Sequence, residues 1–356
     1  MSYVVADGSL EATSQKRLRK HWFVAPVLAA VYPLTLSGFT QAANAAKVSG
    51  SLAQGLFAAV FLALSVTVPI VSMWVFGRLL KSSTPTRAEM WARRAALIAV
   101  ASPPLFVFTG VMTFVAGAPS LDVWILAAFW LALCIAIMTA DRRQPVPLPR
   151  EAVNGNLRVS HGVVALVFIV AFLSLHLANH LSALVSVPTH AAIMDVLRQY
   201  YRSAIVEPIL FCAVAFLVVS GGVLAWKWSA RPGDAFRAFQ VGTGVFLAVA
   251  IFSHMQAVFW FARIHMKIPT DWGFAIGAPT GIVFDPWNIR LLPYYFLAVV
   301  FAIGHPFAGL RIVMLQHGGD RKVAAWLVVG GTALGLLIAT LISLAMGGLR
   351  VNFSGT

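Results

Sequence analysis

The sequence predicts an all-α protein, a polytopic transmembrane helix bundle of about nine spans with its N-terminus inside and its C-terminus outside. The first observation is composition: 60% of the 356 residues are hydrophobic and only 11% are charged. A soluble domain carries about 25% charged residues, because they must cover its surface. The second observation is the length of the apolar runs, because each has roughly the 20 residues that a helix needs to cross a bilayer. Together they exclude a soluble enzyme, a disordered chain and a disulfide scaffold.

The apolar runs locate the expected spans one by one. Each is apolar on nearly all sides, as expected for helices that face lipid or one another. The nine expected spans are 22–42, 55–77, 95–116, 123–140, 160–184, 205–226, 239–262, 291–314 and 323–346.

The third observation is the distribution of basic residues, which sets the orientation. Nineteen of the 26 Lys and Arg residues fall in the tail and loops on one side of these spans, and seven fall on the other. Excess Lys and Arg marks the cytoplasmic side, so the N-terminus lies inside and the C-terminus outside. The net charge of +14 therefore reflects topology, and the expected partner is a lipid bilayer, with no nucleic acid.

Polar breaks divide the chain into regions. For the first expected span, the alternative is a signal peptide, because a basic stretch followed by an apolar run ends at Ala43-Asn44-Ala45, which resembles a cleavage site. Outside the membrane, 185–204 has the length of a surface helix, and Trp272 and Trp287 suit interfacial anchors. The regions are a cytoplasmic tail 1–21, a four-helix membrane region 22–140, a Pro- and Arg-rich cytoplasmic linker 141–159, a five-helix region 160–346 and a short tail 347–356.

Ionisable residues inside the membrane are the main functional signal, because each is costly to bury. Of the twelve acids only Glu207 enters a span, near the outer surface and beside Pro208. Ion-coupled transporters usually place a carboxylate near the midplane, so this class is disfavoured. Four histidines lie within spans, and neutral imidazole is both the cheapest such group to bury and the usual axial ligand of haem iron. They are His176, His180, His254 and His305.

Depth indicates which histidines can cooperate. At 1.5 Å per residue, His176 and His254 each lie about 12 Å from the outer end of their helices, whereas His305 lies about 21 Å deep. Two histidines at matched depth suit a bis-histidine haem b lying edge-on between them, with His305 the alternate ligand for either. Cations at the outer end would pair with haem propionates. These cations are Arg198, Arg202, Arg263, Lys267 and Arg290, and the polar residues that could bind quinone or a propionate are His180, Asn179, Glu207 and Gln256.

Two segments resemble the membrane cytochrome b subunits of succinate dehydrogenase and fumarate reductase. The first, LRVSHGVVALVFIVAFLSLHLANH, matches through Arg158, Ser160, Gly162 and His176, and the second, HPFAGLR, through His305, Gly309 and Arg311. The resemblance covers about residues 156–316. It implies haem ligation at these histidines, with Gly309 letting a macrocycle approach the backbone. Because His161 interrupts the Ser-Gly pair and the span 205–226 has no His, the resemblance implies one haem.

In that family the membrane subunit anchors a soluble dehydrogenase and hands electrons to quinone. This chain has neither a dinucleotide-binding glycine motif nor a cysteine cluster. Any enzymatic activity would therefore come from a soluble redox partner. The expected function is transmembrane or membrane-to-quinone electron transfer in a bacterial inner membrane. Two alternatives stay open: a haem-free channel, transporter, lipid-handling protein or assembly factor, and a protein that holds haem transiently.

Overall fold

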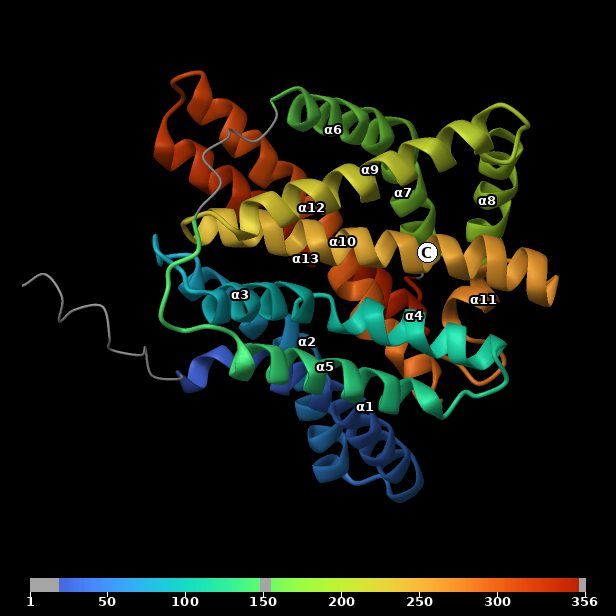
Figure 1. The fold of residues 1–356 in the computed structure, drawn as a ribbon. Helices are drawn as coiled ribbons and strands as arrows, with labels where there is room; N and C mark the ends of the chain where they lie inside the picture. The colour runs from blue at the N-terminus through green and yellow to red at the C-terminus, as the bar shows by residue number, and fades with distance from the viewer. Residues whose placement is uncertain (1–18, 148–154, 352–356) are drawn as a thin grey trace, which may run out of the picture.

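The computed structural model describes residues 19–147 and 155–351. Most of the expected N-terminal tail, the centre of the linker and the end of the C-terminal tail lie outside the described residues. The helices, shown in Figure 1, are η2 (Lys20–Trp22), α1 (Val24–Ser49), α2 (Leu52–Leu79), α3 (Arg87–Ala99), α4 (Ser102–Val115), α5 (Leu121–Thr139), α6 (Gly155–Phe168), η3 (Ile169–Leu173), α7 (Ser174–Ser182), α8 (Val187–Tyr201), α9 (Val206–Ser229), α10 (Ala235–Met255), η4 (Gln256–Met266), α11 (Trp272–Ile276), η5 (Asn288–Arg290), α12 (Leu291–Gln316) and α13 (Arg321–Met346).

The all-helical class is confirmed, since the described residues form helices and no strand. Within residues 19–147 and 155–351, eight helical segments are long and apolar enough to cross a membrane, and a bent pair raises the number to nine if it is one span. Their exposed apolar side chains, such as Leu34, Trp74 and Trp326, indicate contact with a lipid bilayer. The eight segments are Val24–Ser49, Leu52–Leu79, Leu121–Thr139, Gly155–Ser182, Val206–Ser229, Ala235–Met266, Asn288–Gln316 and Arg321–Met346.

The expected span over 95–116 is not one unbroken helix, although the two helices there together are long and apolar enough for one broken span. The chain forms α3 and α4 instead, and their axes meet at 71°. Pro103 and Pro104 occupy the first turn of α4, where a missing N–H is tolerated because that group has no helical partner. The same residues cannot donate to carbonyls of a preceding turn, so a straight helix through this point would lose hydrogen bonds.

Several other boundaries differ from the sequence reading. The α6 helix begins at Gly155, so the last residues assigned to the linker 141–159 are helical. The α1 helix continues through Ala43–Ala45 to Ser49. Two spans contain π-helical stretches, η3 between α6 and α7 and η4 after α10. Such stretches re-aim the side chains that follow, because each turn takes an extra residue. The surface helix expected over 185–204 is confirmed as α8.

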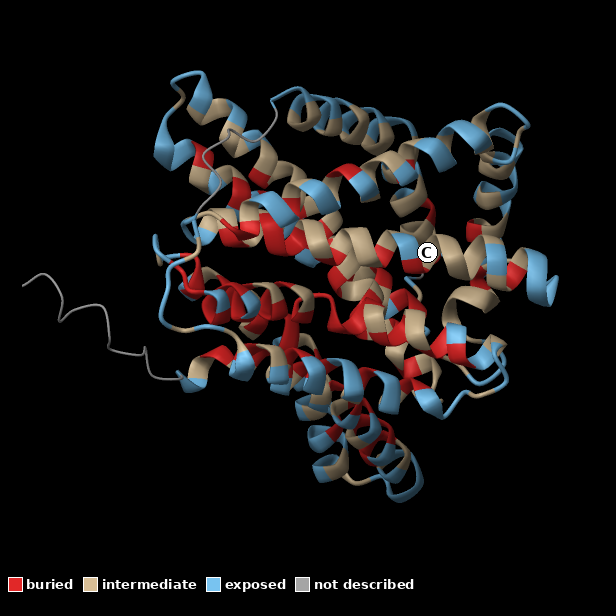
Figure 2. Ribbon diagram, viewed as in Figure 1, coloured by how far each residue is buried: buried red, intermediate tan, exposed pale blue. Residues whose placement is uncertain are grey.

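The packed core lies where α1, α2, α3, α5 and α10 meet, and a second core joins α10, α12 and α13. Figure 2 shows buried residues concentrated there. By contrast, α6 and η3 contribute no buried residue, and α6 lies at one edge of the bundle beside α9 (Figure 1). We call the end of the bundle that holds α8 and α11 the α8 end. The opposite end, where α2 and α9 finish, is the linker end.

Candidate functional site

Two spans bring three histidines together near the α8 end. The ring centroids of His176 on α7 and His254 on α10 lie 6.1 Å apart, with their planes at 68°. His180, one helical turn after His176, places its Nε2 3.3 Å from the Nε2 of His176. Phe172 stacks on the other side of the His176 ring at 5.2 Å. His176 and His254, which the sequence places at matched depth, are therefore neighbours in the fold.

A fourth histidine, which is not among those that the sequence places within spans, extends this cluster. His190 on α8 is 2% exposed and stacks on His180 with ring centroids 5.5 Å apart. Trp272, expected as an interfacial anchor, is instead 3% exposed and lies 4.9 Å from His190. Burial, reinforced by the positive charge of Arg198, lowers the pKa of His190, and Asp271 opposes the shift. His190 is therefore neutral at pH 7.

Hydrogen bonding fixes the tautomer of His190. The amide nitrogen Nδ2 of Asn179 lies 3.4 Å from His190 Nε2, and an amide nitrogen only donates, so Nε2 accepts. In the neutral ring the proton then sits on Nδ1. That Nδ1–H is buried with no hydrogen-bond partner among the described residues. The Asn179 orientation is supported by its Oδ1, which accepts from Ser182 Oγ at 3.4 Å.

Other polar atoms near this end of the bundle also lack a hydrogen-bond partner among the described residues. Trp272 Nε1, Tyr201 OH and Gln256 Oε1 are also buried with no partner within the described part of the chain. Tyr201 packs against Phe172 at 4.7 Å, and Gln256 follows His254 by two residues. A buried donor without a partner costs about 1–3 kcal/mol, and natural proteins usually satisfy such atoms with water or ligand. Unpartnered donors on His190, Trp272 and Tyr201 thus lie in or beside the histidine cluster, whereas Gln256 contacts Met112 of α4.

Three of the expected cations at the α8 end, Arg198, Arg202 and Arg263, have definite partners. Arg198 donates to the backbone oxygen of Thr270 at 2.8 Å, and Arg202 donates to the Thr270 hydroxyl at 2.8 Å. Arg263 and Glu207, assigned separately from sequence, form an ion pair with two hydrogen bonds. Arg198, Arg263 and partial burial lower the pKa of Arg202, and burial is the largest cause. Arg198 and Arg202 keep a positive charge beside the cluster.

Two further assignments lie elsewhere. Arg290 pairs with Asp122 of α5 and stacks over Phe106 at 3.9 Å, so it joins the two halves of the bundle. Gln256 donates a weak hydrogen bond to the sulfur of Met112 at 3.7 Å.

His305 lies in a second polar site toward the linker end. Its Nδ1 is 3.0 Å from the Thr243 hydroxyl. Thr243 precedes His254 by eleven residues on α10, so the two residues are about 16 Å apart along the helix axis. Thr243 donates to the Phe239 carbonyl at 2.7 Å, so its oxygen accepts from Nδ1–H. The Nε2 of His305 therefore carries the lone pair. A Cβ on Gly244 would stand 3.0 Å from this ring, which explains the glycine.

His161 on α6 repeats this arrangement. Its Nδ1 lies 2.7 Å from Ser220 Oγ, and Ser220 donates to the Phe216 carbonyl at 2.5 Å. A Cβ on Gly221 would stand 3.3 Å from the His161 ring. The α6 helix packs against α12, the helix that carries His305. Sequence reading missed this pair because Ser220 and Gly221 carry no signal without their partners.

The remaining family-like positions lie nearer the linker end. No atom comes within 4 Å of the position a Cβ would take on Gly309, so that side of α12 is open. Arg311 lies 3.6 Å from Asp234 and stacks over Phe236 at 3.9 Å.

The ring-centroid separation of His176 and His254 can be compared with that of two imidazoles on one haem iron. Two imidazoles bound on opposite sides of one metal, each at about 2.0 Å, place their ring centroids roughly 6 Å apart. The His176–His254 separation of 6.1 Å matches this value. A haem supplies four ligands of its own, so two imidazoles complete its coordination. Within residues 19–147 and 155–351, no group of three or more His, Cys, Asp or Glu side chains is arranged to hold a metal ion by itself.

Comparisons with known proteins return no match: no family model, no curated protein and no solved structure matches this chain.

Proposed function

We propose that this chain is an integral membrane haem b protein that transfers electrons to or from quinone. The observation that supports it is the His176–His254 pair, 6.1 Å apart on two spans. Two imidazoles bound to one haem iron would leave no open position on it, which favours electron transfer over oxygen chemistry. The bound haem would supply the one-electron redox couple.

The chain's own residues divide the remaining tasks. His176 and His254 hold the iron from α7 and α10, and Phe172 fixes the His176 ring by stacking. Arg198 and Arg202 supply positive charge for propionates, and the Arg263–Glu207 pair closes α9 against η4. The unpartnered donors on Trp272, Tyr201 and His190 suit the two carbonyl oxygens of a quinone, which accept hydrogen bonds.

We extend the proposal to setting and partner. The protein lies in a bacterial inner membrane, with the charge-rich linker end in the cytoplasm, as the positive-inside rule requires. A soluble dehydrogenase docked at that end would exchange electrons with the haem. The chain itself serves as an oxidoreductase membrane subunit.

The test is a visible difference spectrum, dithionite-reduced minus oxidised, of protein purified in mild detergent after expression with ample haem. We expect a sharp α-band of a six-coordinate b-type cytochrome at close to one haem per chain. His254→Ala removes that band, whereas His317→Ala, at the exposed end of α12, leaves it unchanged. A colourless wild-type protein would overturn the proposal and favour a haem-free transporter, lipid-handling protein or assembly factor.

Two other results would revise the proposal. Loss of the band in His305→Ala, with His254→Ala unaffected, would move the haem to the linker-end site, where His161 is the companion ring. Substoichiometric haem that dissociates during gel filtration would favour a protein that holds haem transiently.

A further inference from the structure

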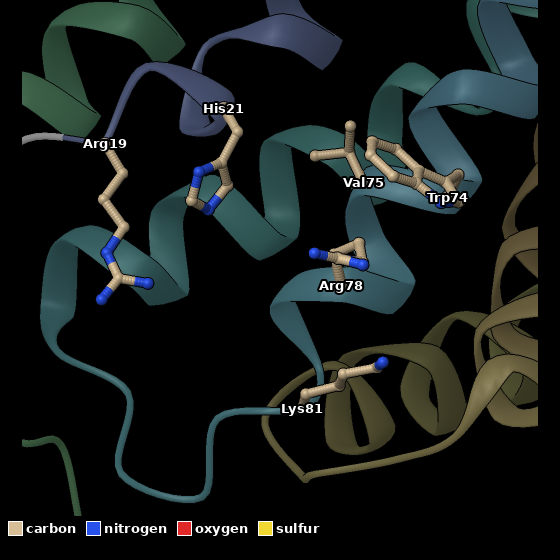
Figure 3. A pocket seen from close by; sticks show the side chains of 6 residues that line it. All are labelled: Arg19, His21, Trp74, Val75, Arg78 and Lys81. Atoms are coloured by element: carbon tan, nitrogen blue, oxygen red, sulfur yellow. The ribbon is translucent and has the colours of Figure 1, made fainter.

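A cavity of about 360 Å³ opens at the linker end, remote from the histidine sites. Figure 3 shows side chains from two segments around it. Arg19 and His21 come from the segment before α1, and the others come from the last turns of α2 and the residue after its cap. The lining residues are Arg19, His21, Trp74, Val75, Arg78 and Lys81.

The lining is cationic, and none of the described residues that form it carries a carboxylate. Arg19, Arg78 and Lys81 carry three permanent positive charges around one opening. Their effect reaches His21, whose pKa is lowered first by burial and then by the charges of Arg19 and Arg78. Like charges at this spacing repel one another, and an anion placed among them would remove the repulsion.

Glu89 on α3 also acts on the His21 pKa, but its carboxylate serves as a helix cap. Glu89 raises the His21 pKa only as the smallest contribution. Its carboxylate accepts from the backbone N–H of Thr86 at 2.9 Å and closes the capping box of α3. Glu89 is 5% exposed and does not line the cavity. An anionic solute or lipid that entered the cavity would meet three cations.

We propose that this cavity binds a phosphate-bearing anion. Arginine presents a planar fork of donors that matches phosphate oxygens, and lysine adds a point charge. Basic pockets between membrane helices on the cytoplasmic side suit anionic headgroups. Trp74, which is 61% exposed, lies beside Arg78, whose guanidinium is 5.5 Å from its ring. An indole at that position suits the boundary between headgroups and acyl chains.

The phosphate has two sources, a lipid headgroup or a free phosphate compound, and the experiment separates them. One arm counts lipids retained on the full chain by native mass spectrometry from nanodiscs of phosphatidylglycerol or of phosphatidylcholine. The other arm titrates inorganic phosphate into protein in uncharged detergent by calorimetry. The variants are Arg78→Gln, Lys81→Gln and Arg19→Gln. The control is Arg87→Gln, which removes an exposed basic residue on the same end but outside the cavity.

We expect each cavity variant to weaken binding about ten-fold, the effect of losing one charge-assisted contact, and Arg87→Gln to change it less than about two-fold. Selective retention of phosphatidylglycerol identifies a headgroup site, and calorimetric binding of inorganic phosphate identifies a free-anion site. Absence of both, or equal effects of Arg78→Gln and Arg87→Gln, would overturn the proposal. Arg19→Gln guards against misfolding, because Arg19 precedes the first span and is exposed.

Discussion

The ion pair between Arg290 and Asp122 allows one stability prediction to be worked through. It joins η5 to α5 across 168 residues of sequence. The Asp122 side chain is 2% exposed and that of Arg290 is 13% exposed. Arg290→Met removes the guanidinium and leaves a carboxylate almost without water. Breaking a buried pair in this way costs about 3–5 kcal/mol. Losing the contact with Phe106 at 3.9 Å adds about 0.5–1 kcal/mol.

Asp122→Asn has a smaller cost. The amide keeps an oxygen that can accept from Val123 N–H, as Asp122 does at 2.8 Å, and Arg290 retains some access to water. We expect about 1–3 kcal/mol, the cost of an unsatisfied buried partner. The double variant should then lose at least about 2 kcal/mol less than the sum, because neither charge is stranded.

The measurement is the free energy of unfolding in detergent, from denaturant titrations followed by far-ultraviolet circular dichroism. Arg321→Met, at an exposed position at the start of α13, is the control and should change stability by less than about 0.5 kcal/mol. A loss below about 1 kcal/mol for Arg290→Met, or additive effects in the double variant, would refute the reasoning.

Three further predictions concern the polar sites. Gly244→Val should lower the free energy of unfolding by about 1–3 kcal/mol, since a Cβ there meets the His305 ring at 3.0 Å. Gly309→Ala should leave the free energy of unfolding unchanged, because the space around Gly309 is open. A thermal melt compares the two variants. Trp272→Phe should keep the fold and weaken quinone binding about ten-fold by removing an unpartnered donor; unchanged quinone titration would count against the donor role. The folded-state pKa of His21 lies below its ordinary value of 6.5, so the unfolded chain takes up the proton first and stability falls as pH drops below about 6.5. His21→Gln should flatten that part of the pH profile; an unchanged slope would contradict it.

The sequence by itself determined the class of protein and the places of most spans. Long apolar runs must form helices in lipid because no water is present to satisfy an open backbone. The matched depths of His176 and His254 follow from the constant rise of a helix. Pro103 and Pro104 are visible in the sequence and permit a bend within 95–116, but the 71° angle between α3 and α4 comes only from the structure.

Only the tertiary structure decided which polar groups meet. Burial of His190 and Trp272 depends on how α8 and α11 fold back over α7, and a hydropathy pattern along one chain does not encode that contact. Arg263 meets Glu207, and Ser220 meets His161, because each pair sits on two helices whose rotation about their axes is set by packing. Spans that are apolar on nearly all sides leave that rotation undetermined, so the shapes of facing side chains fix it.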